Sequence, residues 1–167
     1  KPMTDFHTAD LLDQHEDAAR AGRVRVVEPM FRAYGGRARV HGAIATLKVF
    51  EDNTLVRKAL EAPGNGRVLV IDGGGSKRCA LVGDQLAQLG VKNGWAGIVV
   101  YGCIRDSSAM AGMDIGLRAL DTHPLKSIKK GAGDADIAVT FGGVTFTPGE
   151  HLYADEDGVV VSPAPLL

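Results

Sequence analysis

The sequence is poor in several features that would narrow its function at once. It has only two cysteines, Cys79 and Cys103, and they form neither a disulfide framework nor a pair with metal-ligand spacing. Aromatic residues make up 5% of the chain, and no apolar run approaches the length of a membrane span. We therefore expect reduced thiols and no membrane partner. Because no charged-then-apolar leader opens the sequence, we also expect a cytoplasmic location.

The charge balance argues against nucleic acid as a partner. The chain carries 19 Lys and Arg against 20 Asp and Glu, a net charge of −1, and its basic residues are spread along the sequence. No basic block offers a nucleic-acid footprint, so direct binding of RNA or DNA is not expected. The 167 residues, of which 45% are hydrophobic and 23% charged, predict a single globular domain over residues 1–167.

The stretch from Val68 to Asp106 is the centre of the predicted fold. Two short apolar runs, residues 68–71 and 98–101, have the length and β-branched content of strands. Residues 84–93 between them have helical spacing, so the stretch predicts a βαβ unit. In such units ligands bind outside the carboxyl ends of the strands.

The other elements surround this unit. Expected helices cover residues 9–17, with Thr8 as N-cap, and 54–61, and one or two helical turns follow Asp106. Together with the short β-type runs, they predict an α/β fold with a mixed sheet or two stacked sheets, and with a C-terminal β meander. The predicted strands cover residues 24–27, 37–41, 43–50, 115–120, 137–141, 144–146, 152–154 and 159–162.

Three consecutive glycines follow Asp72, but their spacing fits no nucleotide motif. A dinucleotide fingerprint opening at Gly73 requires glycine at position 78, where Arg78 stands. A phosphate-binding loop requires Gly-Lys-Ser/Thr, whereas Ser76 precedes the lysine here, and Ser76 also interrupts a methyltransferase-type glycine pattern. The motif therefore favours a tight turn with positive φ, or a close backbone approach, over nucleotide binding.

A more specific candidate site consists of Asp84, Arg105 and Asp106. The βαβ spacing allows the start of the helix and the end of the next strand to lie side by side. Two carboxylates with water suit Mg²⁺ or Mn²⁺, and an adjacent guanidinium suits a substrate carboxylate or a developing oxyanion. The alternative is a helix-capping aspartate beside a surface ion pair, and spacing alone favours that alternative.

The remaining polar residues suggest no second site. The five histidines are scattered without metal-ligand spacing, and Cys103 fits a packed thiol better than a nucleophile. We interpret the basic cluster of Lys126, Lys129 and Lys130 as a solvated loop.

Nearly the whole chain resembles one known family. It is similar to the family of the regulator of ribonuclease E activity A, which also contains the 4-hydroxy-4-methyl-2-oxoglutarate aldolases. Its most specific feature is Asp84 followed, after twenty residues, by Arg105-Asp106. The matching segments are residues 27–31, 35–37, 50–53, 68–76, 80–106, 114–116, 141–146 and 152–155.

The resemblance implies a fold, an assembly and a chemistry. The implied fold is a compact β/β/α sandwich of the swivelling-domain type, assembled as a homotrimer or as a dimer of trimers. Asp106 would be the direct metal ligand, Asp84 would hold water on the metal, and Arg105 would bind the pyruvyl unit. The backbone of Gly83, Asp84, Gln85 and Leu86 would hold the substrate carboxylate, because helix N-termini suit anions.

Two functions follow from the resemblance. The first is a class II lyase that uses Mg²⁺ or Mn²⁺ and acts on a small 2-oxo acid. It would cleave 4-hydroxy-4-methyl-2-oxoglutarate to pyruvate, decarboxylate oxaloacetate, or do both. Because family members that act only as inhibitors can lack the acidic ligands, Asp84 and Asp106 favour this function. The second is a protein-binding regulator that inhibits ribonuclease E.

Overall fold

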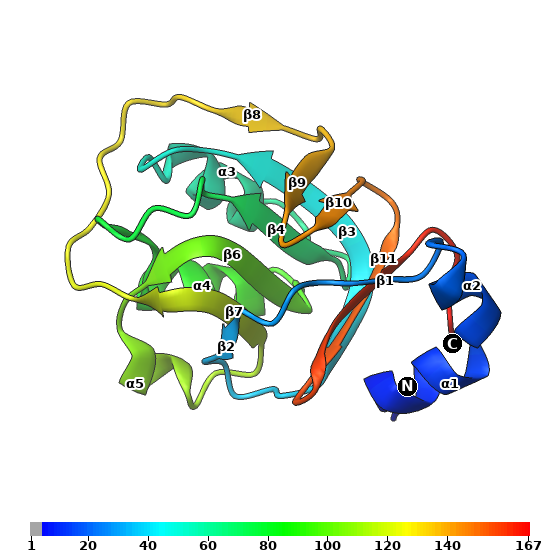
Figure 1. Cartoon of the computed structure of the whole chain (residues 1–167). Helices are drawn as coiled ribbons and strands as arrows, with labels where there is room; N and C mark the ends of the chain where they lie inside the picture. The colour runs from blue at the N-terminus through cyan, green and yellow to red at the C-terminus, as the bar shows by residue number, and fades with distance from the viewer. Residues whose placement is uncertain (1–4) are drawn as a thin grey trace.

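A computed structural model describes residues 5–167 (Figure 1). The helices are α1 (Thr8–Gln14), α2 (Glu16–Arg20), α3 (Thr54–Glu61), α4 (Asp84–Lys92) and α5 (Ser107–Met110). The strands are β1 (Arg25–Val26), β2 (Arg32–Ala33), β3 (Val40–Lys48), β4 (Val68–Asp72), β5 (Ala80–Val82), β6 (Gly97–Ile104), β7 (Gly116–Thr122), β8 (Asp134–Ala135), β9 (Val139–Phe141), β10 (Val144–Phe146), β11 (His151–Asp155) and β12 (Gly158–Ser162).

A large mixed sheet organises the chain, with strand order β1-β12-β11-β3-β4-β6-β7-β2. Its centre is parallel: β3 pairs with β4, β4 with β6, and β6 with β7. The unit β4-α4-β6 confirms the predicted βαβ motif, and the register places Val68 opposite Gly97 and Asp72 opposite Tyr101. The carboxyl ends of these strands therefore meet at one edge of the sheet.

Strand β3 joins the parallel and antiparallel parts of the sheet. Its first residues pair antiparallel with β11, and from Ile44 onward it pairs parallel with β4. Gly42 lies at this junction, where a Cβ atom would stand 2.3 Å from the carbonyl oxygen of Gly66. Only glycine allows the backbones to approach so closely, which explains a glycine inside a long strand.

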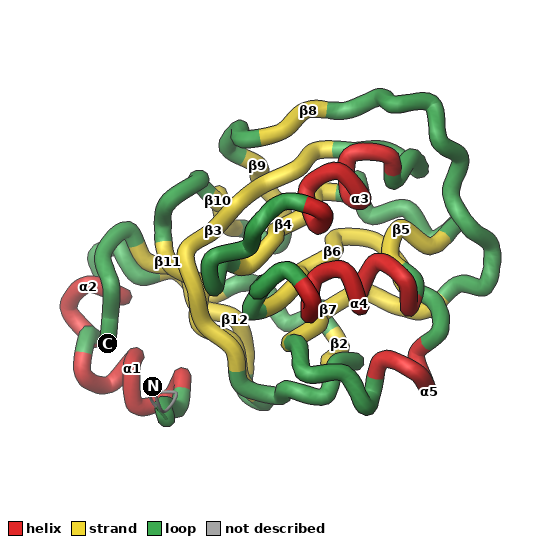
Figure 2. The backbone as a smooth tube through the Cα atoms, turned by 180° about the vertical axis from the view of Figure 1, so that it is seen from behind, coloured by secondary structure: helices red, strands yellow, loops and turns green. Residues whose placement is uncertain are grey.

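The sheet is covered on both faces, which gives the expected β/β/α layering (Figure 2). Helices α3 and α4 lie on one face, over a core that includes Leu60, Ala87 and Ile98. Hairpin β9–β10 lies on the other face, where Phe141 and Phe146 stack with ring centroids 4.4 Å apart. Both faces of β4 are buried, so its sequence is apolar without alternation.

Several predicted boundaries are wrong for physical reasons. The helix expected over residues 9–17 is two helices that meet at His15. Thr8 is not the N-cap; its hydroxyl and amide donate to the carboxylate of Asp155, which ties the helix to the end of β11. The strand expected over residues 37–41 begins at Val40 and continues through Gly42 to Lys48. By contrast, α3 has the predicted bounds.

The C-terminal meander consists of two separate hairpins, β9–β10 and β11–β12, because β11 pairs with β3 rather than with β10. Three short strands, β2, β5 and β8, were absent from the sequence predictions. With two or three residues each, they are too short to show a period. In residues 5–167 no helix is long and apolar enough to cross a membrane.

Candidate active site

A polar pocket of about 190 Å³ lies at the carboxyl edge of the parallel strands, around the N-terminus of α4. Drug-sized pockets span about 300–1,000 Å³, so this pocket is of a size for a small metabolite. It brings together all three residues of the predicted constellation. Its lining consists of Asn53, Arg57, Ala80, Gly83, Asp84, Gln85, Leu86, Arg105, Asp106, Lys126 and Lys129.

Strand β5 is the element that closes this site. Val82 pairs with Ile104 at the end of β6, and the Arg105 amide donates to the Val82 carbonyl over 2.9 Å. Gly83 consequently lies against the next residues of β6. A Cβ atom on Gly83 would stand 2.9 Å from Oδ2 of Asp106 and 3.4 Å from Nε of Arg105. Glycine is therefore required for the two residues to occupy their places.

Asp106 adopts a left-handed backbone conformation, with φ 62° and ψ 39°. Aspartate tolerates this region better than most residues, and such outliers gather at functional sites. The turn directs its side chain to the start of α4, where Oδ2 accepts a 3.0 Å hydrogen bond from the Asp84 amide. A carboxylate is favoured there because the helix N-terminus carries partial positive charge.

Asp84 is the first residue of α4, and its Oδ1 accepts a 2.8 Å hydrogen bond from the Gln85 amide. Two of the amides expected to hold a substrate carboxylate are thus engaged with the acids of the site. Among residues 5–167, no hydrogen bond reaches Oδ2 of Asp84 or Oδ1 of Asp106. One carboxylate oxygen of each acid remains available to a ligand.

Arg105 is partly exposed and lies between the two acids and the segment after β7. Its Nη1 donates a 3.4 Å hydrogen bond to the Pro124 carbonyl, which orients the guanidinium without neutralising it. Within the described chain no carboxylate lies within 4.0 Å of this guanidinium. The surface Arg–Asp ion pair, one part of the alternative that the sequence favoured, is therefore not formed. The other part, a helix-capping aspartate, is met by the Asp106 carboxylate at the first amide of α4.

The pocket also contains cations that sequence reasoning missed. Arg57 comes from α3, and Lys126 and Lys129 come from the segment between β7 and β8. The solvated-loop interpretation of these lysines was incomplete: they are exposed, but they line the pocket, and Nζ of Lys129 donates to Oδ1 of Asn53 over 3.0 Å. No sequence pattern links them to Asp106, because only tertiary contacts bring their segment there.

Asp52 supplies several of those contacts by binding the segment between β7 and β8, which passes the carboxyl edge of the sheet (Figures 1 and 2). Its carboxylate accepts from the amides of Lys130 and Ala132, and from the amide and hydroxyl of Thr54. Burial alone would raise the pKa of Asp52, but these hydrogen bonds outweigh burial and lower the pKa to about 2. Asp52 thereby fixes the loop that carries both lysines.

The donor set fits a hard divalent cation. Mg²⁺ is commonly held by one or two carboxylates while it keeps several waters, and Asp84 and Asp106 offer free oxygens of that kind. In residues 5–167 no three His, Cys, Asp or Glu side chains gather as a metal site. A cation here would therefore depend on these two acids, on water and on substrate oxygens.

The other candidates from the sequence do not contribute chemistry. The triple glycine forms a tight turn: Gly74 and Gly75 have positive φ, and the amides of Gly73, Gly74 and Gly75 donate to Tyr101 or Asp72. No free cradle of amides is left for a phosphate. Cys103 is 1% exposed, and burial raises the pKa of its thiol, as expected of a packed cysteine.

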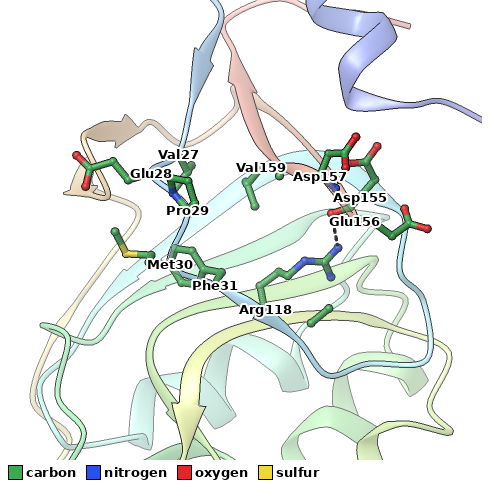
Figure 3. A pocket seen from close by; sticks show the side chains of 12 residues that line it. Val27, Glu28, Pro29, Met30, Phe31, Arg118, Asp155, Glu156, Asp157 and Val159 are labelled. Carbon is green, nitrogen blue, oxygen red and sulfur yellow. Dashed lines mark hydrogen bonds between the residues drawn. The ribbon is translucent and has the colours of Figure 1, made fainter.

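A larger pocket, of about 380 Å³, lies between residues 27–31 and the start of β12 (Figure 3). Its buried Arg118 donates to the backbone carbonyls of Ala38 and Asp155. Acidic residues outnumber this single arginine in the lining, and Figure 3 shows the carboxylate of Glu28 far from the other acids. The smaller pocket is the better site for an anionic substrate.

Comparison with known proteins identifies the family of the chain. The model of the RraA-like family, described as Aldolase/RraA, matches residues 8–161. The chain belongs to the RraA-like family. A protein of Aromatoleum aromaticum named "Putative 4-hydroxy-4-methyl-2-oxoglutarate aldolase" is 70% identical, over 98% of this chain and 99% of its own.

Two solved structures of this RraA-like fold carry different functional names. One, described as the RNA-processing inhibitor RraA from Thermus thermophilis, has a TM-score of 0.90 at 44% identity and covers 97% of this chain and 95% of its own. The other, from Geobacillus kaustophilus, is described as an S-adenosylmethionine: 2-dimethylmenaquinone methyltransferase; its TM-score is 0.90 at 50% identity, over 96% and 97% of the two chains. The closed glycine turn of the present chain gives no support to methyl-donor binding.

Proposed function

We propose that this RraA-like protein is a divalent-metal-dependent pyruvyl lyase. It would cleave 4-hydroxy-4-methyl-2-oxoglutarate into two molecules of pyruvate and would also decarboxylate oxaloacetate. The observation that carries the proposal is the convergence of Asp84, Arg105 and Asp106 on one small polar pocket. The name of the Aromatoleum relative supports the aldolase part.

Each side chain has a role that its geometry supports. Asp106 would hold Mg²⁺ or Mn²⁺ through its free oxygen, Asp84 would hold water on the ion, and the bound ion would supply Lewis-acid stabilisation of negative charge on the 2-oxo oxygen. Arg105 would bind the pyruvyl unit and stabilise the same developing charge. The N-terminus of α4, from Gly83 to Leu86, would contribute its remaining amides to the pyruvyl carboxylate.

The cleavage then requires one proton transfer at the start. The C4 hydroxyl would give its proton to a base, a water oriented by Asp84. The C3–C4 bond breaks, its electron pair forms the pyruvate enolate, and the other half leaves as pyruvate. Protonation of the enolate at C3 completes the reaction. Oxaloacetate loses CO₂ through the same enolate and needs no hydroxyl base.

The test is pyruvate release from both substrates with Mg²⁺, with and without a chelator. We expect Asp106→Asn to lower kcat/KM at least a hundredfold with little change in Tm, because asparagine keeps an acceptor for the Asp84 amide but loses the charge. Asp114→Asn, at an exposed aspartate outside the pocket, is the matched control. Turnover that survives chelation, or an Asp106→Asn variant as active as the wild type, would contradict the proposal.

A second candidate function is inhibition of ribonuclease E, which the Thermus structure favours because its description names an RNA-processing inhibitor. The test is an RNA cleavage assay with ribonuclease E, in which wild type and Asp106→Asn are compared as inhibitors. Inhibition by both proteins would support a regulator that does not need the catalytic acids. Absence of inhibition at micromolar concentration would argue against it.

We also propose that the protein is a homotrimer with the pocket near a subunit contact. Three large apolar side chains support such a contact: Phe50, Leu125 and Ile128 are 59%, 59% and 54% exposed. Exposed apolar residues grouped near a site often mark interfaces. Light scattering of the wild type and of Leu125→Asp would test this, and a monomeric wild type would refute it.

A further inference from the structure

Two cations of the pocket have no role in the chemistry proposed above. Arg57 and Lys126 both line it, and both are exposed. Within residues 5–167, neither side chain forms a hydrogen bond or an ion pair. In contrast, Lys129 is engaged with Asn53, and Arg105 is oriented by Pro124.

Their positions are fixed by the fold rather than by chance contacts. Arg57 lies in α3, where its amide donates to the Asn53 carbonyl. Lys126 is held by a backbone bridge to Ala80, whose amide donates to the Leu125 carbonyl over 2.7 Å. Two separate elements therefore bring an unpaired cation to the same pocket.

The charge of the lining indicates what these cations bind. Arg57, Arg105, Lys126 and Lys129 face only two carboxylates, those of Asp84 and Asp106. Both carboxylates are assigned to a divalent cation, which would add further positive charge. A monocarboxylate at Arg105 leaves this excess of positive charge unbalanced, whereas a second carboxylate on the same ligand supplies the further negative charge that balances it.

We propose that Arg57 and Lys126 bind the second carboxylate of a 2-oxo dicarboxylate, distal to the pyruvyl unit, and so determine substrate class. The inference rests on the proposed lyase function. In 4-hydroxy-4-methyl-2-oxoglutarate this carboxylate departs with the leaving pyruvate, so the contact persists through cleavage. In oxaloacetate the same group departs as CO₂. The contact therefore stabilises the bound substrate and does not lower the barrier of the chemical step.

The experiment distinguishes binding of this second carboxylate from binding of the pyruvyl unit. Arg57→Gln, Lys126→Gln and the double variant are assayed with both dicarboxylates, and by NMR for solvent deuterium exchange at C3 of pyruvate. We expect each single substitution to raise KM for both dicarboxylates about tenfold, without lowering kcat for oxaloacetate. Exchange on pyruvate, which lacks the second carboxylate, should change less than about twofold.

Lys58→Gln is the matched control, since Lys58 is an exposed neighbour on α3 that does not line this pocket. Unchanged KM values in Arg57→Gln and Lys126→Gln, or a parallel loss of pyruvate exchange, would overturn the inference and leave the lyase function intact. A wild type that neither cleaves the dicarboxylates nor exchanges pyruvate would instead refute the proposed function, and the inference with it.

Discussion

The backbone amide of Asp84 donates a 3.0 Å hydrogen bond to the carboxylate of Asp106. This contact joins the first residue of α4 to the residue that follows Arg105 after β6. It fixes one oxygen of Asp106 and leaves the other available. The two acids of the site are therefore positioned relative to each other by the fold itself.

Gly83→Ala should damage the site while sparing the fold. The new Cβ would stand 2.9 Å from Oδ2 of Asp106, so the carboxylate must move away from the Asp84 amide. Because Gly83 has a φ of −114°, alanine causes no backbone strain there. We expect kcat/KM to fall at least tenfold while the free energy of unfolding changes by less than about 1 kcal/mol.

Gly112→Ala is the control for this substitution, because nothing lies within 4 Å of a Cβ atom at Gly112. Full activity in Gly83→Ala would mean that the observed Asp106 geometry is not needed for turnover.

Asp52→Asn should destabilise the protein in a pH-dependent way. The folded pKa of Asp52, about 2, lies below its ordinary value of 3.8, so the charged carboxylate stabilises the folded state above about pH 4. That stabilisation, of about 2 kcal/mol, is lost as the pH falls from about 4 to about 2. Urea denaturation should show a gap between wild type and variant at pH 7 that narrows below pH 4; a gap that does not change with pH would contradict the assignment.

Both thiols should resist labelling in the folded protein. Cys79 and Cys103 are 6% and 1% exposed, and burial raises the pKa of each, which lowers the thiolate fraction at neutral pH. We expect slow reaction with Ellman's reagent at pH 8, release of two thiols in urea, and full turnover in Cys103→Ala. Rapid labelling of Cys103, or loss of turnover in Cys103→Ala, would instead support a role for Cys103 as a nucleophile.

Phe146→Ala should be strongly destabilising. Phe146 is fully buried and stacks on Phe141, so truncation should cost about 3–5 kcal/mol. Val26→Ala, at a side chain that is 52% exposed, should cost far less. Thermal unfolding of the two variants measures the difference, and equal losses would contradict the burial argument.

The local sequence patterns were sufficient for the elements with a clear period or clear ends. The run Val68 to Ile71, the helix over residues 54–61 and the βαβ unit all appear as predicted, because burial on both faces and turn residues determine them. The pairing of Asp84 with Arg105 and Asp106 followed from the parallel topology. Strand β5 did not, because its three residues carry no period, yet its pairing with β6 closes the site.

The cations of the pocket could not be predicted from the sequence, for a different reason. Lys126 and Lys129 look like any solvated basic cluster, and Arg57 looks like an exposed helix residue. Long-range contacts bring the lysines to the acids: the buried carboxylate of Asp52 binds residues about 80 positions later, and Ala80 forms a backbone bridge with Lys126. Such long-range contacts leave no local periodicity in the sequence.

The double pairing of β3 has a consequence for how the molecule opens. Its first half belongs to the antiparallel ladder with β11, and its second half to the parallel ladder with β4. Fraying of one ladder leaves the strand held by the other, so its central amides should exchange with deuterated solvent only through global unfolding. The slowest-exchanging amides of the chain should therefore include those near Ile44, where the two ladders meet.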